Sequence, residues 1–139
     1  MILVDASGVI GALFSDQHRH KECARALDAN EERILSPFVL AEIDYFIQEY
    51  SDVATELLFL DEVITGAYDL APFGTEDIAT ARDVVAQYRS LGIGLADASI
   101  VVLAERYGTY DILTLDERHF RAMRPLTGRK SFRLLPADE

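Results

Sequence analysis

Four acidic residues lie where an apolar segment would be expected to continue, and their side chains are of a type that could bind a metal ion. Asp5 directly follows the apolar run ILV, and Asp116 directly follows ILTL. Glu42 lies within the apolar stretch PFVLAEIDYFIQEY, and Asp97 within GLADASIVVLAERY. A buried carboxylate is costly unless it is paired. Residues 34–81 contain ten acidic residues and no Lys or Arg, so no basic neighbour in that region can neutralise Glu42.

Convergence of these four carboxylates would create a site for a hard cation. Like charges repel and raise one another's pKa, and the remaining compensations are a basic partner, protonation or a metal. Mg²⁺ or Mn²⁺ bound by oxygen ligands and water fits such a set. One or two such ions can polarise a phosphodiester and generate hydroxide from water, so no Ser or Cys nucleophile is needed. Ser7 and Thr114 could orient the carboxylates of Asp5 and Asp116.

Each acid also has an ordinary structural explanation when it is taken alone. Asp5 could end a strand, and Asp116 could cap the helix that begins near residue 117. Asp97 lies early in its helix, where the helix dipole favours an anion. Glu42 could extend past the edge of the core into water. The sequence favours the metal site because all four occur together.

Alternating apolar strands and amphipathic helices must position these acids. Short apolar runs predict strands at 1–5, 33–37, 67–73, 110–116 and 131–136. Helical periodicity and capping residues predict helices at 8–15, 18–30, 37–50, 52–66, 75–92, within 91–108 and at 117–123, with Ser7 and Ser36 as N-caps. The alternation indicates an α/β fold with a mainly parallel central sheet flanked by helices on both faces. In such sheets, sites form beyond the carboxyl ends of the strands, which is where Asp5 and Asp116 are expected.

Composition and charge narrow the class of protein. The 139 residues carry a net charge of −11, half of them are hydrophobic, and we expect a single domain over 1–139. The only cysteine, Cys23, excludes an intramolecular disulfide and a cysteine-based zinc site. We expect a cytoplasmic protein, because no segment resembles a secretory leader or is apolar over the length of a membrane span. In contrast to residues 34–81, residues 118–133 contain six basic residues and no acid.

Four short motifs together resemble the PIN-domain family, and most closely its VapC-type toxins. They are ILVDASGVIGAL, SPFVLAEIDYFI, GIGLADASIVVLAERY and ILTLDERHFRAM, and they occur in the family's order over nearly the whole chain. The resemblance implies a PIN-like three-layer sandwich. It also implies that the family's acidic quartet corresponds to Asp5, Glu42, Asp97 and Asp116, with Ser7 as the hydroxyl residue of the first motif.

The resemblance further implies what the protein does. VapC-type toxins are Mg²⁺-dependent endoribonucleases selective for structured RNA such as tRNA or rRNA, and Mn²⁺ can substitute for Mg²⁺. They form homodimers or hetero-oligomers with a VapB-type antitoxin, whose basic tail reaches the acidic groove. The basic segment 118–133, and in it Arg118, Arg121 and Arg124, is then a candidate for guiding the RNA backbone.

The sequence is also compatible with two other classes of function. A receiver or phosphatase-like phosphotransfer domain would use Asp5 as acceptor or nucleophile. A receiver expects two adjacent acids early in the chain and a Lys at a late strand end, and a phosphatase expects a second Asp where this chain has Ser7. A non-catalytic PIN-like binding module is the other alternative. His18 and His20 invite a metal-site interpretation, but their spacing puts them on opposite sides of a helix. Tyr45, Phe46 and Tyr50 could stack on bases, although packing is the more ordinary role.

Overall fold

A five-stranded parallel sheet forms the centre of the molecule. The computed structural model describes residues 1–139, and its strands have the order β3-β2-β1-β4-β5. Every neighbouring pair is parallel, as the alternating pattern predicts. The strands are β1 (Ile2–Val4), β2 (Arg33–Leu35), β3 (Asp69–Leu70), β4 (Asp111–Leu113) and β5 (Arg133–Leu135).

Seven α-helices connect these strands. They are α1 (Ala6–Leu13), α2 (His20–Asp28), α3 (Pro37–Tyr50), α4 (Val53–Ile64), α5 (Thr75–Gln87), α6 (Leu95–Tyr107) and α7 (Glu117–Ala122). Ser36 caps α3 as predicted, since its hydroxyl accepts from the Phe38 amide at 3.2 Å. The prediction of Ser7 as an N-cap is wrong: α1 begins at Ala6, Asp5 occupies the cap position, and Ser7 lies inside the first turn.

The helix predicted to run from 75 to 92 is shorter than its apolar pattern suggests. It ends at Gln87 because Tyr88 leaves helical geometry, and a 3₁₀ turn follows at Arg89–Leu91. Gly92 then takes φ +71°, a left-handed conformation that suits glycine. This tight turn leads to α6, which begins at Leu95.

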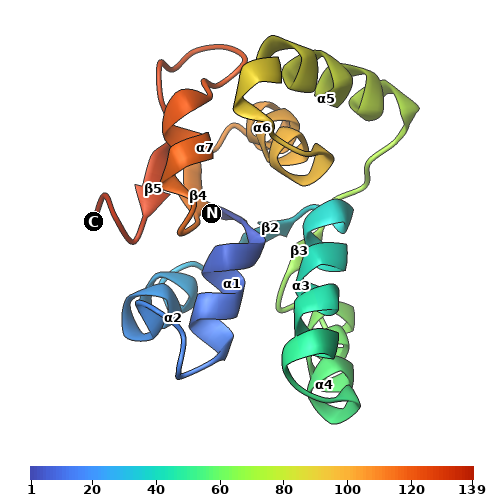
Figure 1. Ribbon diagram of the computed structural model, residues 1–139, viewed down its shortest axis with the longest axis vertical. Coiled ribbons are helices and arrows are strands. Elements are labelled where there is room, and N and C mark those ends of the chain that lie inside the picture. The colour runs from blue at the N-terminus through green and yellow to red at the C-terminus, as the bar shows by residue number, and fades with distance from the viewer.

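The order of the strands places a switch point beside β1. Figure 1 shows α5 and α6 on one side of the strands and α1 to α4 on the other. The chain moves outward from β1 to β2 and β3, and then returns to β4, which pairs with the free side of β1 before the chain moves outward to β5. Right-handed crossovers then require helices on opposite faces for the two directions. The carboxyl ends of β1 and β4 therefore flank the crevice where such folds bind ligands.

The core fixes the elements that border this crevice. The side chains of Ile100, Val101 and Ala104 on α6 are each 1% exposed, and all of β1 is buried. Gly8 allows α1 to approach β4, since a Cβ there would lie 2.5 Å from the Leu113 carbonyl oxygen. No helix combines the length and hydrophobicity that a bilayer crossing needs.

Candidate active site

The four acids singled out in the sequence lie around one cleft. Its volume is about 710 Å³, and its lining includes Asp5, Glu42, Asp97 and Asp116, together with Ser7 and His119. No Lys or Arg lines it. Asp5 comes from the end of β1 and Asp116 from just beyond β4, whereas Glu42 comes from α3 and Asp97 from the first turn of α6. The geometry therefore brings together residues that are up to 111 positions apart in the sequence.

Two hydroxyl groups hold the carboxylate of Asp5. Its Oδ2 accepts a hydrogen bond of 2.9 Å from Ser7 and one of 2.8 Å from Thr114. The Ser7 oxygen accepts from the Leu115 amide at 2.9 Å, and the Thr114 oxygen accepts from the Asp116 amide at the same distance. Each hydroxyl thus spans from Asp5 to the backbone beyond β4. Because Asp5 is 6% exposed and Thr114 is 1% exposed, this network is shielded from solvent.

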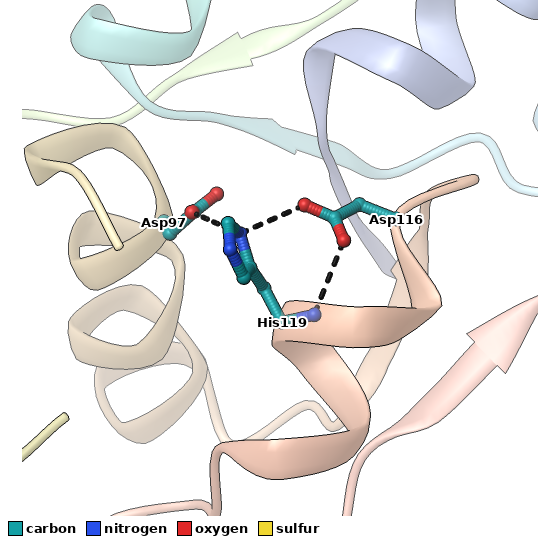
Figure 2. Close-up of side chains that lie close together, drawn as sticks. All are labelled: Asp97, Asp116 and His119. Carbon is teal, nitrogen blue, oxygen red and sulfur yellow. Dashed lines mark hydrogen bonds and ion pairs between the residues drawn. The ribbon is translucent and has the colours of Figure 1, made fainter. Parts of the chain in front are cut away.

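His119 bridges the other two aspartates (Figure 2). Its Nδ1 lies 3.0 Å from Asp97 Oδ2 and 2.9 Å from Asp116 Oδ2. The second oxygen of Asp116 accepts from the His119 backbone amide at 3.1 Å, which caps α7. The structural role expected of Asp116 as a helix cap is therefore real, and it leaves Oδ2 facing the cleft.

A buried hydroxyl pair helps to set the position of Asp97. Ser36, at the end of β2, lies 2.6 Å from Ser99 on α6, oxygen to oxygen, and Ser99 donates to the Ala96 carbonyl. This contact ties the first turn of α6 to the carboxyl edge of the sheet. The same turn carries Asp97, whose side chain is 16% exposed.

The cleft carries more negative charge than its surroundings neutralise. Desolvation raises the pKa of Asp5 above its ordinary value, despite the opposing hydrogen bonds from Thr114 and Ser7. Desolvation and the charge of Asp5 raise the pKa of Asp97 to about 6, against the influence of His119. Glu42 has no hydrogen-bond partner, and partial desolvation with the charges of Asp5 and Asp97 raises its pKa too. Each shift reflects burial of the carboxylate together with the negative charge of its neighbours.

A divalent cation fits this donor set. Carboxylate oxygens are the preferred ligands of Mg²⁺ and Mn²⁺, and a bound cation would offset both the desolvation and the repulsion that raise the three pKa values. Asp97, Asp116 and His119 can each present one ligand atom such that the three atoms lie within 4.8 Å of one another. With Asp5 beside them, these residues could hold an ion against a phosphodiester.

His119 is the residue of this cleft that the sequence analysis missed. It lies three positions after Asp116 in a predicted helix. In a helix capped by Asp116, the third residue of the first turn lies close to the cap, so this spacing is the signal that could have identified His119. The other two histidines, His18 and His20, lie outside the cleft. His18 is exposed, and His20 Nδ1 lies 2.8 Å from the Gly11 carbonyl oxygen, so neither belongs to the cleft.

Aromatic side chains extend the cleft along α3. Tyr45 and Phe46 line it together with Ile10 and Glu49. Phe46 stacks on Tyr50 with ring centroids 4.9 Å apart, which is the packing role expected for both residues. Tyr45 differs, because it is 65% exposed at the cleft.

The basic segment 118–133 is only partly free to bind a ligand. Arg121 is bound to Glu117 and Asp138 at 3.0 and 2.6 Å, and Arg133 is bound to Asp111 at 3.0 Å. Arg118 and Arg124 are exposed, and neither has a carboxylate of the chain within ion-pair distance. Of the three arginines named for RNA, Arg121 is therefore already neutralised.

Comparisons with known proteins agree with the fold and the motifs. Residues 2–124 match the family model of the PIN domain. The chain is 38% identical over 136 residues to the ribonuclease VapC26 of Mycobacterium tuberculosis, a match that covers 97% of this chain and 100% of that protein.

Solved structures share the fold at lower identity. VapC20 of M. tuberculosis, described as a toxin that cleaves the sarcin–ricin loop, matches 84% of this chain and 90% of its own, with a TM-score of 0.76 and 14% identity. A toxin–antitoxin complex from Klebsiella pneumoniae matches 95% of this chain and 100% of its own, with a TM-score of 0.67 and 16% identity. FitAcB from Neisseria gonorrhoeae matches 86% and 91%, with a TM-score of 0.60 and 20% identity.

Proposed function

The chain belongs to the PIN-domain family, and from that premise we propose that it is a VapC-type toxin, a metal-dependent endoribonuclease whose reaction takes place at the acidic cleft. The convergence of Asp5, Glu42, Asp97 and Asp116 on one cleft without Lys or Arg is the observation that carries this proposal. The relative VapC26 is a ribonuclease, and its match covers 97% of this chain and 100% of that protein, which supports the activity.

The proposed mechanism assigns a distinct task to each group. Asp5, Asp97 and Asp116 would hold the divalent cation, and Glu42 would complete the set from α3. When bound, the ion supplies a Lewis acid for the phosphodiester and lowers the pKa of water. Ser7 and Thr114 keep Asp5 ionised and oriented through their two hydrogen bonds. We propose Mg²⁺ as the physiological ion, with Mn²⁺ as a substitute.

For the substrate we propose a structured RNA of the tRNA or rRNA class, in the cytoplasm. The sarcin–ricin loop named for the VapC20 neighbour is one such target to test. Arg118 and Arg124 have no intramolecular partner, so they are available to bind RNA phosphates near the cleft, and Arg121 contributes less. Tyr45 offers an exposed ring at the cleft for an unstacked base.

We also propose that a VapB-type antitoxin regulates this cleft. The structural neighbour from Klebsiella pneumoniae is a toxin–antitoxin complex, which supports a partner of this kind. The charge of −11 and the absence of basic residues from 34 to 81 favour a basic tail as the inhibitory segment. Such toxins assemble as homodimers or as hetero-oligomers with the antitoxin, and we propose the same here.

A cleavage assay with matched variants tests the ribonuclease activity. Purified protein freed of any antitoxin should cut tRNA or a sarcin–ricin oligonucleotide with Mg²⁺ and should stop with EDTA. Asp97→Asn should abolish the activity, whereas the control Asp83→Asn should not, because Asp83 is exposed on α5 and pairs only with Arg82. Full cleavage by Asp97→Asn would refute the assignment of the site and point to a contaminating nuclease.

The alternative functions make different predictions in the same assay. A phosphotransfer domain would acquire an acyl phosphate on Asp5, and the PIN-domain match does not favour that class. A non-catalytic binding module would bind RNA or antitoxin without cutting RNA under any metal condition.

A further inference from the structure

The imidazole of His119 occupies the cleft between two of the acids (Figure 2). Its Nδ1 lies 3.0 Å from Asp97 Oδ2 and 2.9 Å from Asp116 Oδ2, and the side chain is 20% exposed. A neutral imidazole carries at most one hydrogen on Nδ1, so it can donate a full hydrogen bond to only one of these two oxygens. One of the two contacts therefore lacks a full hydrogen bond, and a cation shared by the three atoms would satisfy both oxygens.

The observed spacing, which is that of hydrogen bonds, also suits neighbouring ligands of one metal ion. Two adjacent ligands of an octahedral ion, each about 2.1 Å from it, are about 3.0 Å apart. Both Nδ1-to-oxygen distances match that edge length. The same three residues can present ligand atoms that all lie within 4.8 Å of one another, as ligands of one ion must.

The fold holds this imidazole in place from both ends of its helix turn. Asp116 accepts from the His119 backbone amide at 3.1 Å, which fixes the first turn of α7. The next residue, Phe120, is 1% exposed and anchors that turn in the core. Because the backbone of His119 is held in this way, its ring needs no large movement to become a ligand.

We propose that His119 binds the catalytic divalent ion directly through Nδ1, as a nitrogen ligand beside the carboxylates. The inference rests on the proposed metal-dependent function and deepens it, because it concerns which metal the site selects. Mg²⁺ is a hard ion that favours oxygen, whereas imidazole suits first-row transition ions. A mixed nitrogen and oxygen set therefore favours Mn²⁺ over Mg²⁺ more strongly than carboxylates alone would.

Pulsed electron paramagnetic resonance on the Mn²⁺-loaded full chain tests this directly. Protein labelled with ¹⁵N only at histidine should show the echo modulation of a directly bound imidazole nitrogen. The chain has three histidines, so the signal must be assigned with variants. His119→Asn should remove the modulation, and the matched control His18→Asn should retain it because His18 is exposed outside the cleft. Binding of Mn²⁺ without any histidine modulation would overturn the proposal, as would a failure of the protein to bind Mn²⁺.

Calorimetric titration with each ion gives a second readout that does not require RNA. His119→Asn should weaken Mn²⁺ binding by on the order of tenfold and change Mg²⁺ binding much less. Asn keeps a hydrogen-bond donor near the carboxylates, so unchanged affinity for Mn²⁺ in this variant would mean that His119 only positions Asp97 and Asp116. Circular dichroism verifies that each variant is folded.

The two proposals can fail separately. If the wild-type protein shows the histidine modulation but cuts no RNA, the metal ligand stands and the ribonuclease function fails. If RNA is cleaved with Mg²⁺ or Mn²⁺ and no histidine nitrogen is bound to Mn²⁺, the ribonuclease stands and the role of His119 fails.

Discussion

Two parts of the cleft differ in burial and in hydrogen bonding. The floor of the cleft consists of Asp5, Ser7 and Thr114, and its wall on α3 consists of Glu42, Tyr45 and Glu49. On the floor, Asp5 and Thr114 are buried, Ser7 is half-buried, and each of these polar side chains is held by a hydrogen bond. On the wall, Glu42 has no partner and Tyr45 is 65% exposed. The floor therefore provides fixed geometry at the sheet, whereas the wall provides groups that can move to meet a ligand.

Removing one negative charge from the floor and one from the wall should have the largest effects and is the strongest test of this difference. Asp5→Asn should reduce RNA cleavage by at least about a thousandfold, because a fixed ligand contributes several kcal/mol to the transition state. Glu42→Gln should reduce it by about tenfold, and higher Mg²⁺ should restore part of the loss, since an unfixed ligand acts mainly through charge. Equal losses in single-turnover cleavage would show that the floor and the wall hold the ion alike.

Loss of a single hydroxyl on the floor should have the next largest effect. Thr114→Val keeps the volume but removes the 2.8 Å hydrogen bond to Asp5 and the acceptor for the Asp116 amide. We expect a loss of about 10- to 100-fold in cleavage, the usual effect of removing a group that orients a metal ligand. Thr109→Val is the control, because Thr109 makes one long contact of 3.5 Å far from the cleft. An active Thr114→Val variant would mean that Ser7 alone suffices to orient Asp5.

The stability of the metal-free protein should depend on pH, because burial and the negative charge of Asp5 on the floor raise the pKa of Asp97 on α6. The pKa of Asp97 is about 6 in the folded state and near its ordinary 3.8 when unfolded. Between these values the folded state binds more protons at Asp97, so the stability that Asp97 contributes is fully present below pH 4 and is lost as pH rises through 6. The raised pKa values of Asp5 and Glu42 act in the same direction.

Denaturant unfolding with EDTA measures this effect. Wild type should lose about 2 kcal/mol of stability between pH 4 and pH 7 on account of Asp97. Asp97→Asn should remove that part of the loss, and so should be more stable than wild type at pH 7 without metal. Added Mg²⁺ should reverse the order by stabilising wild type. A flat pH profile in wild type would mean that Asp97 is not under electrostatic stress.

The sequence predicts those features of the site that depend on local pattern. Asp5 and Asp116 follow apolar runs, which is enough to place them at strand ends, and the parallel sheet follows from the alternation of strands and helices. Asp97 is revealed by a charge among apolar residues of a helix. These signals are local, so they survive without knowledge of tertiary contacts.

The remaining features depend on long-range packing that no local pattern encodes. The bridge from His119 to Asp97 joins residues 22 positions apart, and the bonds from Asp5 and Ser7 to the segment after β4 span more than 100 positions. The sequence predicts Ser7 as a helix cap, but its hydroxyl instead accepts a hydrogen bond from the Leu115 amide. Gly8 permits this contact because, without a Cβ, it lets α1 lie close to β4. The neutralisation of Arg121 likewise requires Asp138 to return from the C-terminal segment.

The smallest predicted effect extends the comparison to the basic segment, where Arg118 is unpaired and Arg121 is bound to two carboxylates. If RNA phosphates contact only unpaired arginines, Arg118→Gln should raise KM a few-fold, leave kcat unchanged and lower the salt slope of RNA binding by about 0.7. Arg121→Gln should leave the salt slope unchanged and act only through a slight loss of stability, because exposed ion pairs contribute little. The measurement is RNA affinity over a range of salt concentrations. If Arg121→Gln alters the slope as much as Arg118→Gln does, RNA must displace Asp138 from Arg121, and ion pairing in the free protein does not decide which arginines bind RNA.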